Sequence, residues 1–127
     1  MLKFDHVNVR TANLNAMRTW YAEVLGLSQG WRPDFAFPGA WMYAGDEALV
    51  HLVGVEAEPG SDPGDLKLEH FAFRGDDLAG MRARLEAHGV AVKEFPVPGT
   101  RILQLNIHDP DGNHIHVDFT VDPAEAS

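Results

Sequence analysis

The sequence contains no cysteine among its 127 residues. This excludes disulfide bonds, thiolate nucleophiles and cysteine-ligated zinc or iron–sulfur clusters. It also lacks an apolar run of about 18 residues, which excludes a membrane-spanning helix, and its opening stretch MLKFDHVNVR lacks the features of a secretory signal. We therefore expect a cytoplasmic protein without a membrane partner, in which any metal is bound by His, Asp or Glu.

Positive charge is scarce as well. Ten Lys and Arg residues stand against nineteen Asp and Glu residues, which gives a formal net charge of −9. Such a chain repels phosphate backbones, so we expect no nucleic-acid partner. The length and the 45% hydrophobic content are typical of one soluble domain with a single compact core.

The chain carries an internal repeat. The stretch FDHVNVR at 4–10 matches LEHFAFR at 68–74, an offset of 68 − 4 = 64 residues. The same offset pairs the apolar and basic positions that follow, at Leu14 and Leu78, Met17 and Met81, and Arg18 and Arg82. The register is therefore kept from a predicted strand into a predicted helix, and the two halves should fold alike.

Each half has the pattern of one strand, one helix and three strands. Apolar residues at helical spacing predict helices that start near Leu14 and Leu78, and Gly26 and Gly89 are their expected C-terminal stops. We predict an α+β fold of two βαβββ modules. Module 1 covers 2–54, a Pro- and Gly-containing linker covers 55–66, and module 2 covers 67–122.

Four of the seven histidines occupy repeated positions. His6 pairs with His70 at an offset of 64, and His51 pairs with His116 at an offset of 65. Within each half the separations are nearly equal, 51 − 6 = 45 and 116 − 70 = 46. If a pseudo-twofold axis relates the halves, two imidazole pairs converge on one point and can bind a metal ion. Duplication of a purely structural histidine is the alternative.

The stretch HIHVDF after the turn DPDG predicts a strand with two different faces. Ile115, Val117 and Phe119 share one face, which should pack against a helix, and His114, His116 and Asp118 share the other. His114 has no histidine counterpart in the first half, where Leu49 stands. We interpret His114 as a rim residue rather than a metal ligand.

Aromatic and polar side chains suggest a substrate pocket. The segment WRPDFAFPGAWMY gathers aromatic residues in a loop and the strand after it, and a later strand carries two amides on one face. Tyr43 is the candidate proton-transfer group. The candidate substrate-binding residues are Trp41, Phe35, Gln104, Asn106 and Arg101.

These motifs resemble the vicinal oxygen chelate superfamily, which includes glyoxalase I, bleomycin resistance proteins and extradiol dioxygenases. The resemblance rests on FDHVNV, WYAEVLGL, LEHFAFRGDDLAGMRARLEAHGV and DPDGNHIHV, and it covers nearly the whole chain. It implies paired βαβββ modules that form a partly open mixed β-barrel with helices outside. It also implies that His6, His51, His70 and His116 bind a divalent ion, either Zn, Ni, Mn or Fe.

The resemblance predicts a metal-dependent enzyme of glyoxalase or lyase type that chelates a small oxygen-bearing substrate. Small members of the superfamily are commonly homodimers, so we expect a homodimer. One departure matters, because His116 occupies a position where metal-dependent members usually have a glutamate. Two alternatives stay open: an extradiol-type iron dioxygenase, and a metal-free drug-binding protein of the bleomycin resistance type.

Overall fold

The computed structural model describes residue 1 and residues 4–60 and 67–122. These residues group into two compact units, one on each side of the segment 61–66. Part of the linker expected over 55–66 therefore lies outside the described residues. No helix in the described part of the chain is long and apolar enough to cross a membrane.

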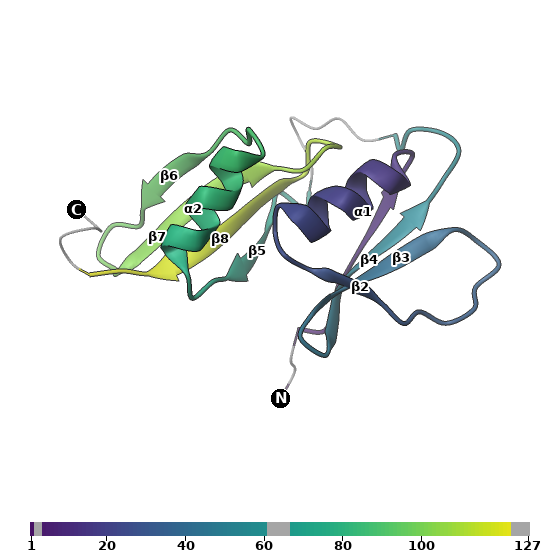
Figure 1. The fold of residues 1–127 in the computed structure, drawn as a ribbon, viewed down its shortest axis with the longest axis horizontal. Coiled ribbons are helices and arrows are strands. Elements are labelled where there is room, and N and C mark those ends of the chain that lie inside the picture. Colours follow the sequence, from purple (N-terminus) through teal and green to yellow (C-terminus); the bar gives the residue numbers. More distant parts are fainter. Residues whose placement is uncertain (2–3, 61–66, 123–127) are drawn as a thin grey trace. The chain divides into compact units, whose positions relative to one another are not determined.

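Both units have the same order of elements (Figure 1). The first unit contains β1 (Val7–Thr11), α1 (Leu14–Glu23), β2 (Ser28–Gly30), β3 (Gly39–Ala44) and β4 (Glu47–Gly54). The second contains β5 (Phe71–Arg74), α2 (Leu78–Ala87), β6 (Lys93–Pro96), β7 (Ile102–His108) and β8 (His114–Thr120). The predicted α+β class and the two βαβββ modules are confirmed.

Each module forms its own mixed sheet of four strands. The strand orders are β1-β4-β3-β2 and β5-β8-β7-β6, so the first and last strands of each module are parallel neighbours. The strands pair as two separate sheets and not as one closed barrel. Asn8 lies opposite His51, and Ala72 lies opposite His116. Between the modules, the first-strand residues of these pairs are 72 − 8 = 64 positions apart and the last-strand residues are 116 − 51 = 65 positions apart. The strand pairing therefore reproduces the two offsets found in the sequence.

The two helices end at the glycines that the sequence predicts. Gly26 and Gly89 adopt φ angles of 78° and 64°, a left-handed conformation that favours glycine and ends a helix. In the first module α1 packs on β2, β3 and β4, and Met17 and Tyr21 on this helix are fully buried. In the second module the side chain of Asp77 caps α2 by accepting from the backbone N–H of Gly80.

The strands β7 and β8 separate apolar from polar residues as predicted. Ile115, Val117 and Phe119 are all buried, while Gln104 and Asn106 on β7 are partly exposed. The other apolar side chains of this core are Leu85, Leu103, Leu105, Ile107 and Val121. The polar positions of β8 therefore lie on the face opposite this core.

A buried aspartate organises the turn between β7 and β8. Asp109 is 5% exposed, and its Oδ1 accepts from the backbone N–H groups of Asp111 and Asn113 at 3.0 and 2.9 Å. Its Oδ2 accepts from the side-chain amide of Asn113 at 2.8 Å. Gly112 follows with a φ of 85°, which a glycine adopts without strain. The turn fixes the register of β8 and so places His114 and His116 on the polar face.

Candidate metal centre

The first module brings His6 and His51 together. Their rings stack with centroids 3.8 Å apart and planes 9° from parallel. Trp41, directly opposite His51 on β3, also stacks on the His51 ring at 3.9 Å. His51 is 8% exposed, whereas the His6 side chain, just before β1, is 37% exposed. The predicted pair therefore consists of one buried and one accessible imidazole.

Each ring of this pair has one nitrogen bound to an oxygen. His6 Nδ1 lies 2.6 Å from Asp5 Oδ2, and His51 Nε2 donates to the carbonyl of Ala48 at 3.0 Å. Burial, together with the nearby His6, lowers the pKa of His51 below its usual value. The hydrogen bond from His6 lowers the pKa of Asp5. His6 Nε2 and His51 Nδ1 are then the nitrogens available to a metal ion, and the neutral ring is the form that binds metal.

The second module repeats this arrangement. The rings of His70 and His116 have centroids 4.5 Å apart, and again the ring on the last strand is buried, with His116 at 6% exposure. His116 Nδ1 lies 2.5 Å from Asp118 Oδ1, and His70 Nδ1 lies 3.1 Å from Glu69 Oε2. Both contacts leave Nε2 available. All four imidazoles thus have one nitrogen held by an oxygen, an arrangement typical of metal-binding histidines.

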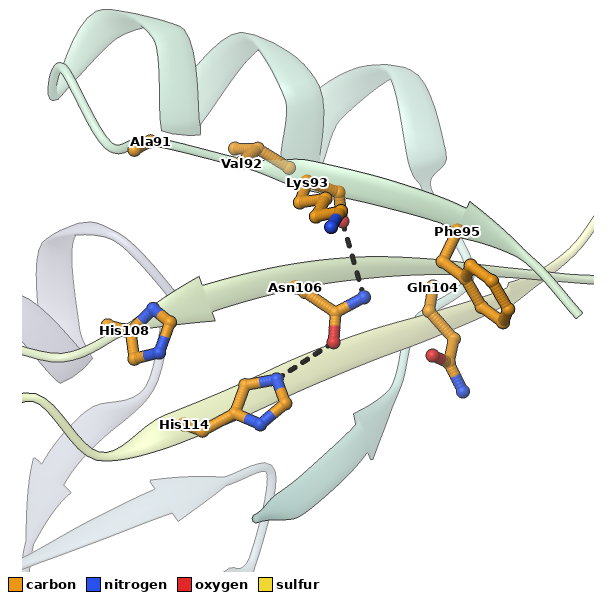
Figure 2. Close-up of a pocket in the computed structure, with 8 residues that line it drawn as sticks. All are labelled: Ala91, Val92, Lys93, Phe95, Gln104, Asn106, His108 and His114. Carbon is orange, nitrogen blue, oxygen red and sulfur yellow. Dashed lines mark hydrogen bonds between the residues drawn. The ribbon is translucent and has the colours of Figure 1, made fainter. Parts of the chain in front are cut away.

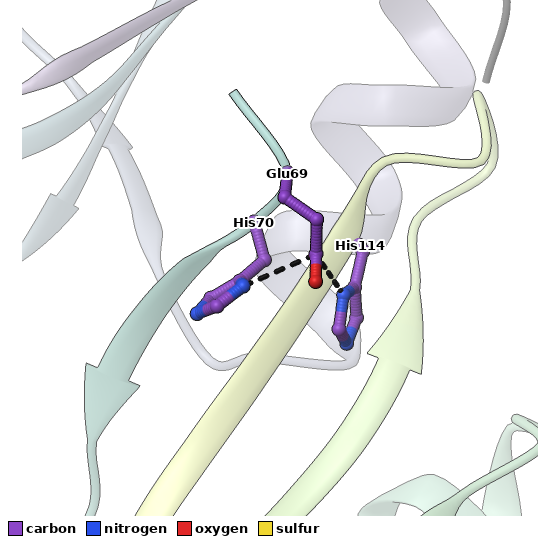
Figure 3. A group of neighbouring side chains, drawn as sticks. All are labelled: Glu69, His70 and His114. Carbon is purple, nitrogen blue, oxygen red and sulfur yellow. Dashed lines mark hydrogen bonds and ion pairs between the residues drawn. The ribbon is translucent and has the colours of Figure 1, made fainter. Parts of the chain in front are cut away.

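Glu69 joins a second group of possible ligands (Figure 3). One donor atom of Glu69, one of His70 and one of His114 all lie within 4.8 Å of one another. The Nδ1 atom of His114 is 2.7 Å from Glu69 Oε2, and this hydrogen bond, with that of His70, lowers the pKa of the carboxyl. The interpretation of His114 as a rim residue overlooked this contact. Sequence reasoning did not single out Glu69, although an acid precedes the repeated histidine in both FDH and LEH.

A pocket of about 530 Å³ lies beside His114 on the polar face of the second sheet (Figure 2). The predicted substrate-binding residues Gln104 and Asn106 both line it. The other lining residues are Ala91, Val92, Lys93, Phe95, His108 and His114. The pocket therefore combines apolar walls with two amides, two imidazoles and one ammonium group.

Three other predicted site residues lie elsewhere. Tyr43 Oη donates to the backbone carbonyl of Trp31 at 2.5 Å, so its proton is already engaged. The ring of Phe35 is 43% exposed and stacks on Phe37 in the loop before β3. Arg101 donates to the carbonyl of Val121 and is not among the residues that line the pocket.

Within each module, the donor atoms are of the kinds that bind a divalent metal ion. Imidazole and carboxylate are common ligands of Zn, Ni, Mn and Fe. The contacts that orient the four rings come from side-chain carboxylates and a backbone carbonyl.

The sequence matches the model of the Glyoxalase/Bleomycin resistance protein/Dioxygenase superfamily over residues 3–117. The chain belongs to this superfamily. The resemblance noted in the sequence is confirmed.

Curated members of the superfamily resemble the chain at moderate identity. "Glyoxylase I 4" of Arabidopsis thaliana is 27% identical, over 92% of the chain and 70% of the relative. "Biphenyl-2,3-diol 1,2-dioxygenase 2" of Rhodococcus globerulus is 31% identical over 98% of the chain and 67% of the relative. A manganese-dependent 2,3-dihydroxybiphenyl 1,2-dioxygenase of Geobacillus genomosp. 3 is 30% identical over 88% of the chain, which spans only 37% of that enzyme.

Solved structures share the fold. A glyoxalase family protein from Bacillus anthracis superposes with a TM-score of 0.77 at 20% identity, covering 94% of this chain and 96% of that one. A lactoylglutathione lyase from Agrobacterium tumefaciens gives 0.68 at 21% identity, with 92% of each chain covered. At these identities the superpositions show the fold, and the reaction has to be argued from the site.

Proposed function

We propose that the chain is a metal-dependent enzyme of glyoxalase or lyase type that acts on a small oxygen-bearing substrate. The observation that carries this proposal is the repeated imidazole pair, in which every ring has one nitrogen held by an oxygen and the other available. We propose His6 and His51 in the first module, and His70 and His116 in the second, as metal ligands. A bound ion would supply Lewis-acid chemistry, polarising oxygens of the substrate.

The residues around the ligands have supporting roles in this proposal. Asp118 and Ala48 orient the two buried rings, His116 and His51, through their second nitrogens. Trp41 covers His51 with an apolar surface that keeps water away from the ring. In the pocket, Gln104 and Asn106 offer amides to polar groups of a substrate. Tyr43 is a proton donor only if its hydrogen bond to Trp31 opens.

The test uses protein purified without a histidine tag, stripped of metal and reloaded with Zn²⁺ or Ni²⁺. We expect His51→Ala and His116→Ala each to weaken Zn²⁺ binding at least about tenfold and to abolish activity in a lactoylglutathione lyase assay. His88→Ala is the matched control, because His88 caps the C-terminus of α2. Binding of less than about 0.2 equivalents of any of the four metals by the wild-type chain would instead favour the metal-free binding protein.

An extradiol-type dioxygenase is the second candidate function. Two relatives are dioxygenases by name, at 30% and 31% identity. Glu69, His70 and His114 also offer the two imidazoles and one carboxylate found in non-haem iron oxygenases. Oxygen consumption with 2,3-dihydroxybiphenyl by the Fe(II)- or Mn(II)-loaded chain, and none by the metal-free chain, would replace the lyase proposal.

We also propose that the chain is a homodimer and that its partner molecule is the small-molecule substrate. The exposed outer strands support this proposal, since β2 is exposed throughout and a partner can cover a sheet edge. Light scattering at micromolar concentration should give twice the monomer mass of 14.0 kDa. A monomer mass would contradict it.

A further inference from the structure

In the second module, two imidazole side chains contact the same carboxylate oxygen of Glu69. Glu69 Oε2 lies 3.1 Å from Nδ1 of His70 and 2.7 Å from Nδ1 of His114 (Figure 3). We propose that Glu69, His70 and His114 form a second ligand set, which binds harder divalent transition-metal ions such as Mn²⁺. This set is distinct from the four imidazoles proposed above and shares only His70 with them.

A chain of hydrogen bonds fixes the orientation of His114. The Asn106 amide donates through Nδ2 to the carbonyl of Lys93 at 3.2 Å, so its Oδ1 faces Nε2 of His114 at 2.8 Å (Figure 2). An amide oxygen only accepts, and Nε2 therefore carries the hydrogen. In the neutral ring, Nδ1 then presents its lone pair. Metal-binding histidines are held in the same way, through a hydrogen bond from the other ring nitrogen.

The lone pair of His114 points to a carboxylate oxygen. This 2.7 Å contact needs a cation between the two atoms, either the proton of the hydrogen bond described above or a metal ion that takes the proton's place. Neighbouring ligands at about 2.1 Å from a metal ion, at right angles, lie about 3 Å apart. The two contacts of Glu69 Oε2, at 2.7 and 3.1 Å, bracket this separation. The three side chains can therefore bind one ion after only small shifts.

The donor types select the ion. Carboxylate oxygens favour manganese and ferrous ions more than purely imidazole sites do, and two imidazoles with one carboxylate leave coordination positions open for a substrate. The Glu69 and His114 side chains are 68% and 27% exposed, so an ion can reach them from solvent. His114 also lines the pocket, which places this ligand set beside a space large enough for a small molecule.

The two ligand sets exclude each other within the second module, because both need His70. An ion in the imidazole set depends on His116, whereas an ion in the carboxylate set depends on Glu69 and His114. The inference therefore does not rest on the proposed function. Zn²⁺ affinity and lyase activity test the proposed function, while Mn²⁺ affinity tests the carboxylate set.

The experiment measures Mn²⁺ binding to the untagged full chain from the electron paramagnetic resonance signal of the free ion. We expect Glu69→Gln and His114→Ala each to weaken Mn²⁺ binding at least about tenfold. His116→Ala should stay within about twofold of the wild type. His108→Ala is the matched control, since its ring stacks 5.3 Å from His114 and lines the same pocket without belonging to the ligand set.

Two results would overturn the inference. One is Mn²⁺ binding by Glu69→Gln and His114→Ala that equals the wild type, or that falls no further than in His116→Ala. The other is a wild-type chain that binds no Mn²⁺, whatever its Zn²⁺ affinity. Glu69→Gln keeps the test independent of folding because the side chain is exposed and the substitution keeps its shape. Thermal unfolding of each variant checks that the fold is intact.

Discussion

In the first module the paired imidazoles lie against an indole, whereas in the second they lie among acids and amides. His51 stacks on Trp41, and the matching His116 lies opposite Asn106 and contacts Asp118. Equivalent residues nevertheless lie opposite each other in both modules, Asn8 opposite His51 and Ala72 opposite His116. The repeated backbone therefore positions the imidazole pairs, and the surroundings of each pair differ between the modules.

The turns before the last strands differ in the same way. The first module connects β3 to β4 through Gly45 and Asp46, and Gly45 adopts a φ of 63°, as a tight hairpin requires. The second module uses the longer turn around the buried Asp109. Only the second turn depends on a buried carboxylate, so substitutions at the two turns should have very different costs.

The largest expected effect is at this turn. Asp109→Ala removes the acceptors of two backbone N–H groups and one amide, and it should lower the free energy of unfolding by about 2–4 kcal/mol. Asp46→Ala, at an exposed position in the first turn, should change it by less than about 0.5 kcal/mol. Urea unfolding of both variants measures the difference. Equal costs would mean that Asp109 does not organise the hairpin.

A smaller effect is expected just after β5. A Cβ atom on Gly75 would lie 2.4 Å from Cε1 of Phe119 and 3.2 Å from Cγ1 of Val117, both in the core of the second module. Gly75→Ala should therefore destabilise the chain by about 1–3 kcal/mol through overpacking. Thermal or urea unfolding measures the loss, with Gly60→Ala as control because no atom lies within 4 Å of a Cβ there.

The smallest effect concerns two arginines at the same position of the repeat. Arg82 on α2 donates two hydrogen bonds to Glu94 on β6, at 2.8 and 2.7 Å. The position that corresponds to Glu94 in the first module, 94 − 64 = 30, is a glycine, and Arg18 on α1 donates instead to Asn15 on its own helix. Both partners of the Arg82 pair are more than a third exposed. Glu94→Gln should therefore cost at most about 1 kcal/mol at pH 7.

This cost should depend on pH. The hydrogen bonds from Arg82 hold the pKa of Glu94 below its usual value. A carboxyl with a lowered pKa in the folded state stabilises the fold above its unfolded pKa of about 4.3, and this contribution disappears as pH falls through the folded pKa. The difference between wild type and Glu94→Gln should therefore shrink to zero in acid. A difference that stays constant down to pH 2 would assign the cost to packing.

Much of the fold could be predicted from the sequence because the repeat shows the residue pattern of each element in two copies. The repeat and the apolar spacing predicted both helices, their glycine stops and the strand, helix and three-strand order of each module, whereas the parallel pairing of the first strand with the last was seen only in the structure. The two imidazole pairs followed from the same repeat, at offsets of 64 and 65 residues, and the structure brings each pair together. Local periodicity was sufficient for these features because regular elements and their faces depend on residue spacing.

The surroundings of His114 could not be predicted in this way. Its contact with Glu69 joins residues 45 positions apart in the chain, and its contact with Asn106 depends on which amide atom Lys93 engages. Neither is encoded in local periodicity. Tyr43 illustrates the same limit, because its position on β3 followed from the sequence but its hydrogen bond to Trp31 did not. Side-chain partners depend on tertiary packing, which the repeat leaves free to differ between modules.

The parallel pairing of the first and last strands has a consequence for a chain without cysteine. His6 and His51 are 45 residues apart in the chain, and His70 and His116 are 46 apart, yet the rings of each pair meet because the first and last strands of each module are neighbours. An ion bound by either pair would cross-link a long loop and restrict the unfolded chain, as a disulfide does in secreted proteins. Bound metal would then act as a reversible staple, and added chelator should lower the unfolding temperature.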